Sequence, residues 1–125
     1  VRFVDSQDDI NGTNEVYIPH VDGTTGEPIT TDNLVILFSE YLEVDGPTIL
    51  SPELLGTGKA YLVRNGLLQE VTWARDNEED IIKLIDNNGQ HVKLKPGRTW
   101  YEIMNIGSKV TSQGNGDWRF VFYMP

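Results

Sequence analysis

The chain has 125 residues, a formal net charge of −9 at pH 7 and no cysteine. The length suits one domain over residues 1–125. Its densest basic stretch is Lys93, Lys95 and Arg98, which excludes nucleic acid as a partner because phosphate binding needs a basic face. The lack of cysteine excludes disulfides and thiolate-bound zinc. No run approaches the roughly 18 apolar residues of a membrane span, so we expect no membrane insertion by this chain.

Short strands separated by polar loops are predicted along the first half of the chain. The strand patterns cover residues 1–4, 15–18, 33–44 and 48–50, and the loops cover residues 5–14 and 20–32. Residues 33–44 are the most apolar element. Their β-branched content favours a central strand, although a run this short could also be a buried helix.

Two hairpins and two further strands are predicted in the second half. Residues 58–65 and 67–75 form a hairpin around Asn65-Gly66, and residues 81–86 and 90–94 form another around Asn88-Gly89. Strands follow over residues 99–106 and 118–123, with a polar loop over residues 107–117. Residues 76–80 are predicted to be a charged loop, which could also start a short helix. The fold class is therefore mostly β: an antiparallel sandwich or partly open barrel of about eight short strands, with at most one short helix.

Histidine offers one catalytic hypothesis. His20 and Asp22 lie two residues apart, so in an extended segment both side chains point to one side. A neighbouring carboxylate can hold an imidazole in one tautomer. No Gly-x-Ser-x-Gly elbow supplies a nucleophile. An enzyme would use His20, Asp22 and Arg75 in one cleft, but we expect no catalytic residue, and His20 as a loop side chain.

Phosphate and metal motifs are incomplete. The segment from Gly56 to Ala60 lacks the first glycine and the hydroxyl residue of a phosphate loop. The Asn-Gly loops lack the ligand spacing of an EF-hand. A different calcium site from Asp5, Asp8 and Asp9 stays open, although such residues ordinarily cap turns. We predict no cofactor and no metal.

Aromatic side chains supply the remaining candidates for binding. Trp73 alternates with polar residues on its strand and is predicted to lie in the core, whereas Trp100 is ambiguous and Trp118 lies at a strand edge. Exposed rings could stack on sugars, although core packing is the commoner use. The strand over residues 118–123 could also accept a partner strand.

A series of short motifs resembles a known family. It begins with His20-Val21-Asp22, Thr25-Gly26 and Asn33-Leu34-Val35-Ile36, and continues with Gly58-Lys59-Ala60, Trp73-Ala74-Arg75, Asp86-Asn87-Asn88-Gly89 and Pro96-Gly97-Arg98-Thr99-Trp100. Over residues 17–106 this order resembles the C-terminal domain of the YerB-like family of bacterial envelope lipoproteins, a domain of unknown function. The resemblance implies an extracytoplasmic setting associated with the cell envelope, and a lipid anchor on the full-length protein. It implies no activity.

The sequence and the resemblance thus predict a non-catalytic accessory or binding module of a cell-envelope lipoprotein. The alternatives are an enzyme that acts on envelope polymer through a His20/Asp22 cleft, and a structural scaffold for a missing N-terminal domain. The chain begins with Val1, so we expect a fragment or mature form of a longer exported protein. The expected partner is an envelope glycan or protein. We expect the ligand surface where the 20–32 loop meets the 96–100 turn, and the predicted ligand-binding residues are His20, Asp22, Arg75, Arg98, Thr99, Trp100 and Trp118.

Overall fold

The structure, a computed structural model, describes residues 1–5, 16–46 and 48–125. They form two compact parts, residues 1–31 and residues 32–125, and each is described by itself. The proposed calcium ligands Asp8 and Asp9 lie outside the described residues. The single domain over 1–125 stays a prediction.

The first part is a small antiparallel arrangement. Strands β1 (Phe3–Asp5) and β2 (Tyr17–Pro19) pair with each other, and Val21 forms a bridge with Pro28. Backbone hydrogen bonds from His20 to Arg2 and from Ile29 to His20 continue this pairing. The two strands correspond to those predicted over residues 1–4 and 15–18.

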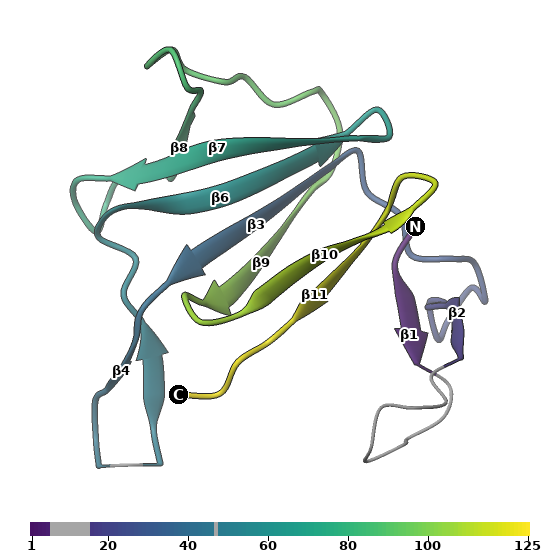
Figure 1. The fold of residues 1–125 in the computed structure, drawn as a ribbon, viewed down its shortest axis with the longest axis horizontal. Helices are drawn as coiled ribbons and strands as arrows, with labels where there is room; N and C mark the ends of the chain where they lie inside the picture. Colours follow the sequence, from purple (N-terminus) through teal and green to yellow (C-terminus); the bar gives the residue numbers. More distant parts are fainter. Residues whose placement is uncertain (6–15, 47) are drawn as a thin grey trace. The chain divides into compact units, whose positions relative to one another are not determined.

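The second part is built on one open sheet of five strands, in the order β8-β7-β6-β3-β9 (Figure 1). Its members are β3 (Asn33–Ser39), β6 (Gly56–Arg64), β7 (Leu67–Arg75), β8 (Lys83–Ile85) and β9 (Thr99–Asn105). All neighbours run antiparallel except β3 and β9, which are parallel from Asn33–Thr99 to Ser39–Asn105. Two two-stranded ribbons complete this part, β4 (Tyr41–Glu43) with β5 (Leu50–Pro52) and β10 (Lys109–Gly114) with β11 (Asp117–Val121).

Both faces of the sheet are apolar, because successive side chains of the buried strands point alternately into two hydrophobic clusters. The first face carries Val35, Leu37, Ala60, Leu62, Val71, Trp73 and Leu84, against which Leu54, Ile82, Val92, Leu94 and Ile103 pack. The second face carries Ile36, Phe38, Tyr61 and Met104, and the β10–β11 hairpin packs against it through Val110 and Phe120. This two-layer arrangement confirms the predicted mostly-β, sandwich-like class.

The C-terminal segment is anchored beside the hairpin. The Phe122 ring packs edge-on against Tyr41, with ring centres 5.5 Å apart. The Tyr123 backbone amide donates to Ser108 Oγ, and Asn105 Nδ2 donates to the Tyr123 carbonyl. The segment after residue 107, which lies outside the stretch that resembles the family, therefore packs against the second face of the sheet.

Three local predictions were wrong. Residues 107–117 form β10 and its turn instead of a loop, because Asn115 and Gly116 adopt the positive φ angles of a tight hairpin. Residues 90–94 form only one bridge, Ile85 with His91, instead of a strand. The 33–44 strand divides at Glu40 into β3 and β4. The described residues contain no helix, in agreement with the limit of one short helix, and residues 76–80 form the predicted charged loop. The described residues form eleven strands, five of which have only three residues, where about eight were expected.

Candidate functional site

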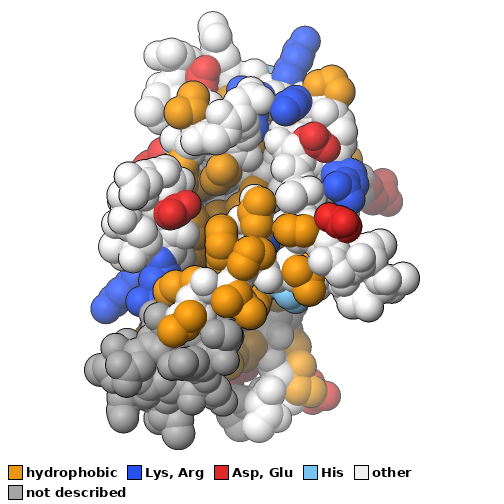
Figure 2. All heavy atoms as spheres, turned by 90° about the vertical axis from the view of Figure 1, so that its right-hand side faces the viewer, with side chains coloured by type: hydrophobic (Ala, Val, Ile, Leu, Met, Phe, Trp, Pro, Cys, Tyr) orange, Lys and Arg blue, Asp and Glu red, His pale blue; other side chains and the backbone are white. Residues whose placement is uncertain are grey.

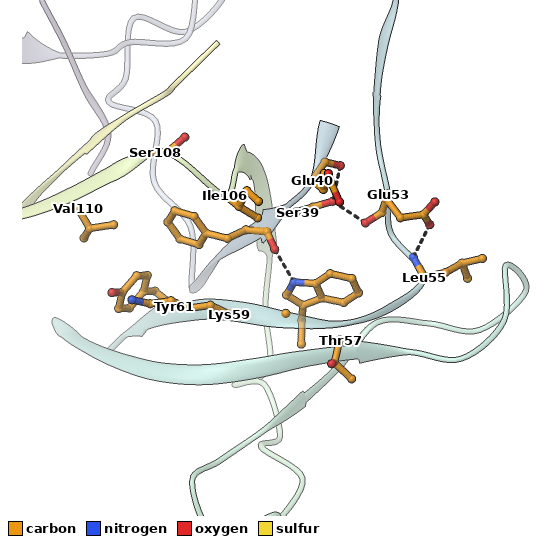
Figure 3. A pocket seen from close by; sticks show the side chains of 13 residues that line it. Ser39, Glu40, Glu53, Leu55, Thr57, Lys59, Tyr61, Ile106, Ser108 and Val110 are labelled. Carbon is orange, nitrogen blue, oxygen red and sulfur yellow. Dashed lines mark hydrogen bonds between the residues drawn. The ribbon is translucent and has the colours of Figure 1, made fainter. Parts of the chain in front are cut away.

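A pocket lies at the C-terminal end of β3, and its volume is about 530 Å³ (Figure 3). We call it the β3-end pocket. Its size lies within the range of about 300–1,000 Å³ that is usual for ligand sites. The apolar lining residues are Phe38, Leu55, Gly58, Tyr61, Trp73, Ile106 and Val110, and the polar ones are Ser39, Glu40, Glu53, Thr57, Lys59 and Ser108.

The pocket exists because the Trp73 indole separates β3 from β6. Trp73 Nε1 donates to the Phe38 carbonyl at 2.8 Å, as the dashed line in Figure 3 marks. The indole reaches this carbonyl across Gly58, where a Cβ would lie within 2.8 Å of the Phe38 oxygen and in collision with the indole. The hydrogen bonds between β3 and β6 therefore end at Leu37–Ala60, while the ladder of β6 with β7 continues to Gly56–Arg75.

Two carboxylates lie on one side of the pocket. The Glu53 amide donates to the Glu40 carbonyl at 2.8 Å, which extends the β4–β5 pairing and sets Glu40 opposite Glu53. Like charges in directly opposite positions repel each other. Among the described residues, neither carboxylate has a basic partner within ion-pair distance. Glu53 Oε1 accepts a hydrogen bond from the Leu55 amide at 3.0 Å, so its orientation is partly held.

One ammonium group lies on the opposite side, next to Tyr61 (Figure 3). Lys59 Nζ lies 4.9 Å from the centre of the Tyr61 ring and 3.7 Å from Glu70 Oε2. A hydrogen bond to the Tyr61 side chain, and secondarily the Glu70 carboxylate, raise the pKa of Lys59 above its usual value. Lys59 therefore stays protonated at neutral pH, and the pocket has an anionic and a cationic end.

Three of the predicted ligand-binding residues, Arg75, Arg98 and Thr99, lie in the part formed by residues 32–125, where each takes part in a hydrogen bond. The Arg75 guanidinium donates to the carbonyls of Asp80 and Glu78 and closes the loop after β7. The Arg98 amide donates to Asp32 Oδ2 at 2.8 Å. Thr99 Oγ1 accepts a hydrogen bond from Asn33 Nδ2. The Arg75 side chain, the Arg98 backbone and the Thr99 side chain thus take part in hydrogen bonds that hold loops.

The two remaining tryptophans retain exposed surface. Trp100 is 37% exposed and Trp118 is 41% exposed. Trp118 points to the same side of its hairpin as Phe120, two residues later, whereas Trp100 lies opposite Leu34 on the second face of the sheet. Neither tryptophan lines the β3-end pocket.

His20 and Asp22 belong to the part formed by residues 1–31. Asp22 Oδ1 accepts hydrogen bonds from the Thr24 and Thr25 amides, and these bonds, with Thr25 first, lower the pKa of Asp22. The carboxylate therefore caps its own turn. His20 Nδ1 is buried without a hydrogen-bond partner in the described part of the chain. That this loop meets the 96–100 turn stays a prediction.

Basic side chains lie scattered over the face shown in Figure 2, as the sequence indicates. No helix in the described ranges is long and apolar enough to cross a membrane. No group of three or more acidic or histidine side chains within those ranges is arranged to hold a metal ion.

Sequence reasoning missed the β3-end pocket because its lining comes from segments scattered between residues 38 and 110. One signal lay in the motifs. Gly58 and Trp73 both belong to them, and the structure shows that the glycine makes room for the indole. No sequence motif pointed to Glu40 and Glu53, since these two residues stand opposite each other only because of the register of β4 with β5.

Comparison with known proteins finds a matching family model and a solved structure with a similar fold. The family model described as the C-terminal domain of a protein of unknown function (DUF3048) matches residues 9–101. The crystal structure of YerB protein from Bacillus subtilis is similar, with a TM-score of 0.61 and 24% sequence identity over 72% of this chain. The match covers 31% of the YerB chain, so this chain spans about a third of that protein. No curated protein matches the chain.

Proposed function

The chain belongs to the family of DUF3048 C-terminal domains, whose function is unknown, and from that premise we propose that it is a non-catalytic module that binds a polypeptide in the β3-end pocket. One observation carries the proposal. The pocket joins apolar walls to two opposed carboxylates that have no ion pair among the described residues. A bound cationic group would relieve the repulsion between Glu40 and Glu53.

The rings of the pocket favour a polypeptide over a glycan. Stacking on a sugar needs an open ring face, but Trp73 is 2% exposed, Phe38 6% and Tyr61 8%. The accessible apolar side chains at the pocket are Leu55 and Ile106. Aliphatic side chains of this kind suit the side chains of a peptide.

Two of the three residues of the enzyme hypothesis have structural contacts, which supports the non-catalytic alternative. Asp22 accepts hydrogen bonds from its own turn, and Arg75 donates to the carbonyls of its own loop. A catalytic pair needs its side chains directed at the substrate.

The proposed setting is the bacterial cell envelope, outside the cytoplasm, with a lipid anchor on the full-length protein. Its support is the resemblance to the YerB-like family, now joined by the family match and by the fold of YerB. A scaffolding role toward an N-terminal domain is compatible with binding, since the chain corresponds to about a third of YerB.

Replacing Thr57 by tryptophan tests the pocket. Thr57 is exposed and lines the pocket, so the larger ring is expected to fill it without disturbing the core. Peptides selected from a displayed random library on the unmodified domain should bind the Thr57→Trp variant at least tenfold more weakly, measured by fluorescence anisotropy.

The matched control is Thr111→Trp, an equal change on an exposed strand position outside the pocket. It should leave the affinity within about twofold, since exposed substitutions change folding by less than about 0.5 kcal/mol. Failure to select any peptide, or equal binding by both variants, would contradict a pocket for polypeptides.

A glycan site at Trp100 and Trp118 is the second candidate, because both rings are more than a third exposed. Stacking of a ring on a sugar persists at high salt because it is not ionic. Co-sedimentation with purified cell-wall sacculi should then resist salt and fall in Trp100→Ala or Trp118→Ala. No sedimentation of the unmodified domain rejects this candidate and leaves the pocket proposal intact.

A further inference from the structure

Strand β9 forms one edge of the five-stranded sheet. It pairs with β3 along its whole length on one side, and within the described ranges no strand pairs with its other side (Figure 1). The opposite edge, at β8, is covered, because the Val92 amide donates to the Leu84 carbonyl and His91 forms a bridge with Ile85. An unpaired strand edge is a template for another strand, so β9 is the edge that could accept one.

Alternate residues of β9 direct their backbone groups away from β3. A β3 amide donates to the Arg98 carbonyl at 3.0 Å, so Arg98 and every second residue after it direct their N–H and C=O groups toward β3. The residues between them face outward, and the Ile103 carbonyl accepts a hydrogen bond from the Tyr41 hydroxyl on that side. Thr99 and Tyr101 make no backbone hydrogen bond on that side in the described part of the chain.

Two features limit the strand that this edge can accept. At one end the Tyr41 side chain is bonded to Ile103, and at the other end the chain turns at Gly97, whose φ is 127°. Two antiparallel copies of the open stretch fit these limits when Thr99 of each copy stands opposite Tyr101 of the other. Each such pair exchanges both of its N–H···O bonds. The strand of each copy then begins opposite Tyr101 and stops short of Ile103.

The side chains of this register are self-complementary. Trp100 stands opposite Trp100 of the second copy, and Arg98 stands opposite Glu102. The Trp100 indole is 37% exposed. Aromatic pairs and pairs of opposite charge in directly opposite positions stabilise neighbouring strands. A shift by two residues would set Arg98 opposite Met104 and bring the added strand onto Tyr41, so the charges and the free length of the edge select the same register.

We propose that two copies of this chain associate through their β9 edges, antiparallel about a two-fold axis at Trp100, so that their two sheets join into one. A two-fold interface uses the same patch of both copies and must therefore be self-complementary. The inference does not rest on the proposed function, because Thr99, Trp100 and Tyr101 do not line the β3-end pocket. The dimer covers Trp100, so the glycan candidate would then depend on Trp118.

Sedimentation equilibrium of this 14.1 kDa chain should show a reversible monomer–dimer equilibrium at concentrations up to millimolar. The salt concentration is about 0.15 M, where the Debye length of about 8 Å screens the repulsion between two copies of net charge −9. Tyr101→Pro removes the outward amide, a change that an edge strand tolerates. Tyr101→Val loses the same ring but keeps the amide, so it should dimerise about tenfold more tightly than the proline variant.

The opposition of Arg98 and Glu102 predicts an exchange of partners. Arg98→Glu and Glu102→Arg should each weaken self-association by about fivefold, because each sets like charges opposite one another. An equimolar mixture of the two variants should form a mixed dimer, in which both pairs again have opposite charges. Mixing would not restore a role that either residue has within its own chain. Circular dichroism verifies that each variant is folded.

An introduced thiol tests the register, since the chain has no cysteine. Trp100→Cys should form a disulfide-linked dimer on mild oxidation, because the two Cα atoms of such a pair lie about 4.5 Å apart, within the range that disulfides span. Glu102→Cys is the matched control on the same face of β9. The two copies of residue 102 would lie about 13 Å apart along the strands, so this variant should stay unlinked.

Three outcomes would overturn the inference. A chain that stays monomeric up to millimolar concentration excludes the dimer and leaves the β9 edge to a strand of another protein. A dimer that Tyr101→Pro and Tyr101→Val form equally well does not pair through this edge. Equal cross-linking at positions 100 and 102 excludes the two-fold axis at Trp100. Each of these results leaves the pocket proposal standing, because Thr57→Trp tests that proposal by peptide affinity.

Discussion

Replacing Trp73 by alanine is expected to lower the free energy of unfolding by about 3–5 kcal/mol, the usual cost of truncating a buried aromatic side chain. The indole is 2% exposed and packs among the side chains of the first face of the sheet. Its loss also leaves the Phe38 carbonyl without the Nε1 donor. Urea unfolding followed by circular dichroism measures the change.

Gly58 should be coupled to Trp73. A Cβ at this position collides with the indole and approaches the Phe38 carbonyl to 2.8 Å. Gly58→Ala should therefore cost about 1–3 kcal/mol by overpacking. In the Trp73→Ala background the added methyl has room, so the double variant should be more stable than the sum of the single changes predicts, by about 0.5–3 kcal/mol. Additive costs would contradict the account of the pocket's origin.

Replacing Asn33 by alanine is the second large effect, with an expected cost of about 2–4 kcal/mol, because buried polar groups left unpaired cost about 1–3 kcal/mol each. Asn33 is fully buried. Its Nδ2 donates to the Lys95 carbonyl at 2.7 Å and to Thr99 Oγ1 at 3.2 Å, and its Oδ1 accepts from the Lys95 amide at 2.9 Å. The side chain thus holds the segment before β9 in register for parallel pairing with β3.

Asn105→Ala is the matched control for Asn33. Asn105 is also buried, but its side chain makes one hydrogen bond in the described structure, to the Tyr123 carbonyl. Its loss should cost about 0.5–1.5 kcal/mol, measured in the same urea titration. Equal costs at the two positions would show that the contacts of Asn33 with Lys95 and Thr99 do not hold the β9 register.

The recognisable motifs mostly serve the fold. In the Pro96–Trp100 motif, Arg98 bonds to Asp32 and Thr99 bonds to Asn33. Asp86 caps the turn at Asn88 and Gln90 through its side chain. A short motif indicates that a residue matters without indicating why, and for Arg98 and Thr99 the reason is a contact with a residue 66 positions away. The motifs therefore predicted the family correctly, and three of their residues, Gly58, Lys59 and Trp73, line the pocket.

Local chemistry made the strands and one hairpin predictable. Asn65 and Gly66 favour the positive φ angles that a two-residue turn needs, and β6 and β7 meet there as expected. The alternation that put Val71 and Trp73 on one buried face also holds. The same turn signal occurs at Asn115-Gly116, but the polar residues around it favour a loop, so the β10–β11 hairpin was not predicted. Their hydrogen bonding to a neighbouring strand outweighs that polarity.

The sequence alone determined the class of fold, the family and the acidic charge, because composition, turn residues and motif order are local properties. Only the tertiary structure decided the parallel pairing of β3 with β9, the opposition of Glu40 and Glu53, and the gap that Trp73 holds open beside β6. Each of these depends on register between distant segments. Register is set by the packing of both faces of the sheet together, which no single stretch of the chain encodes.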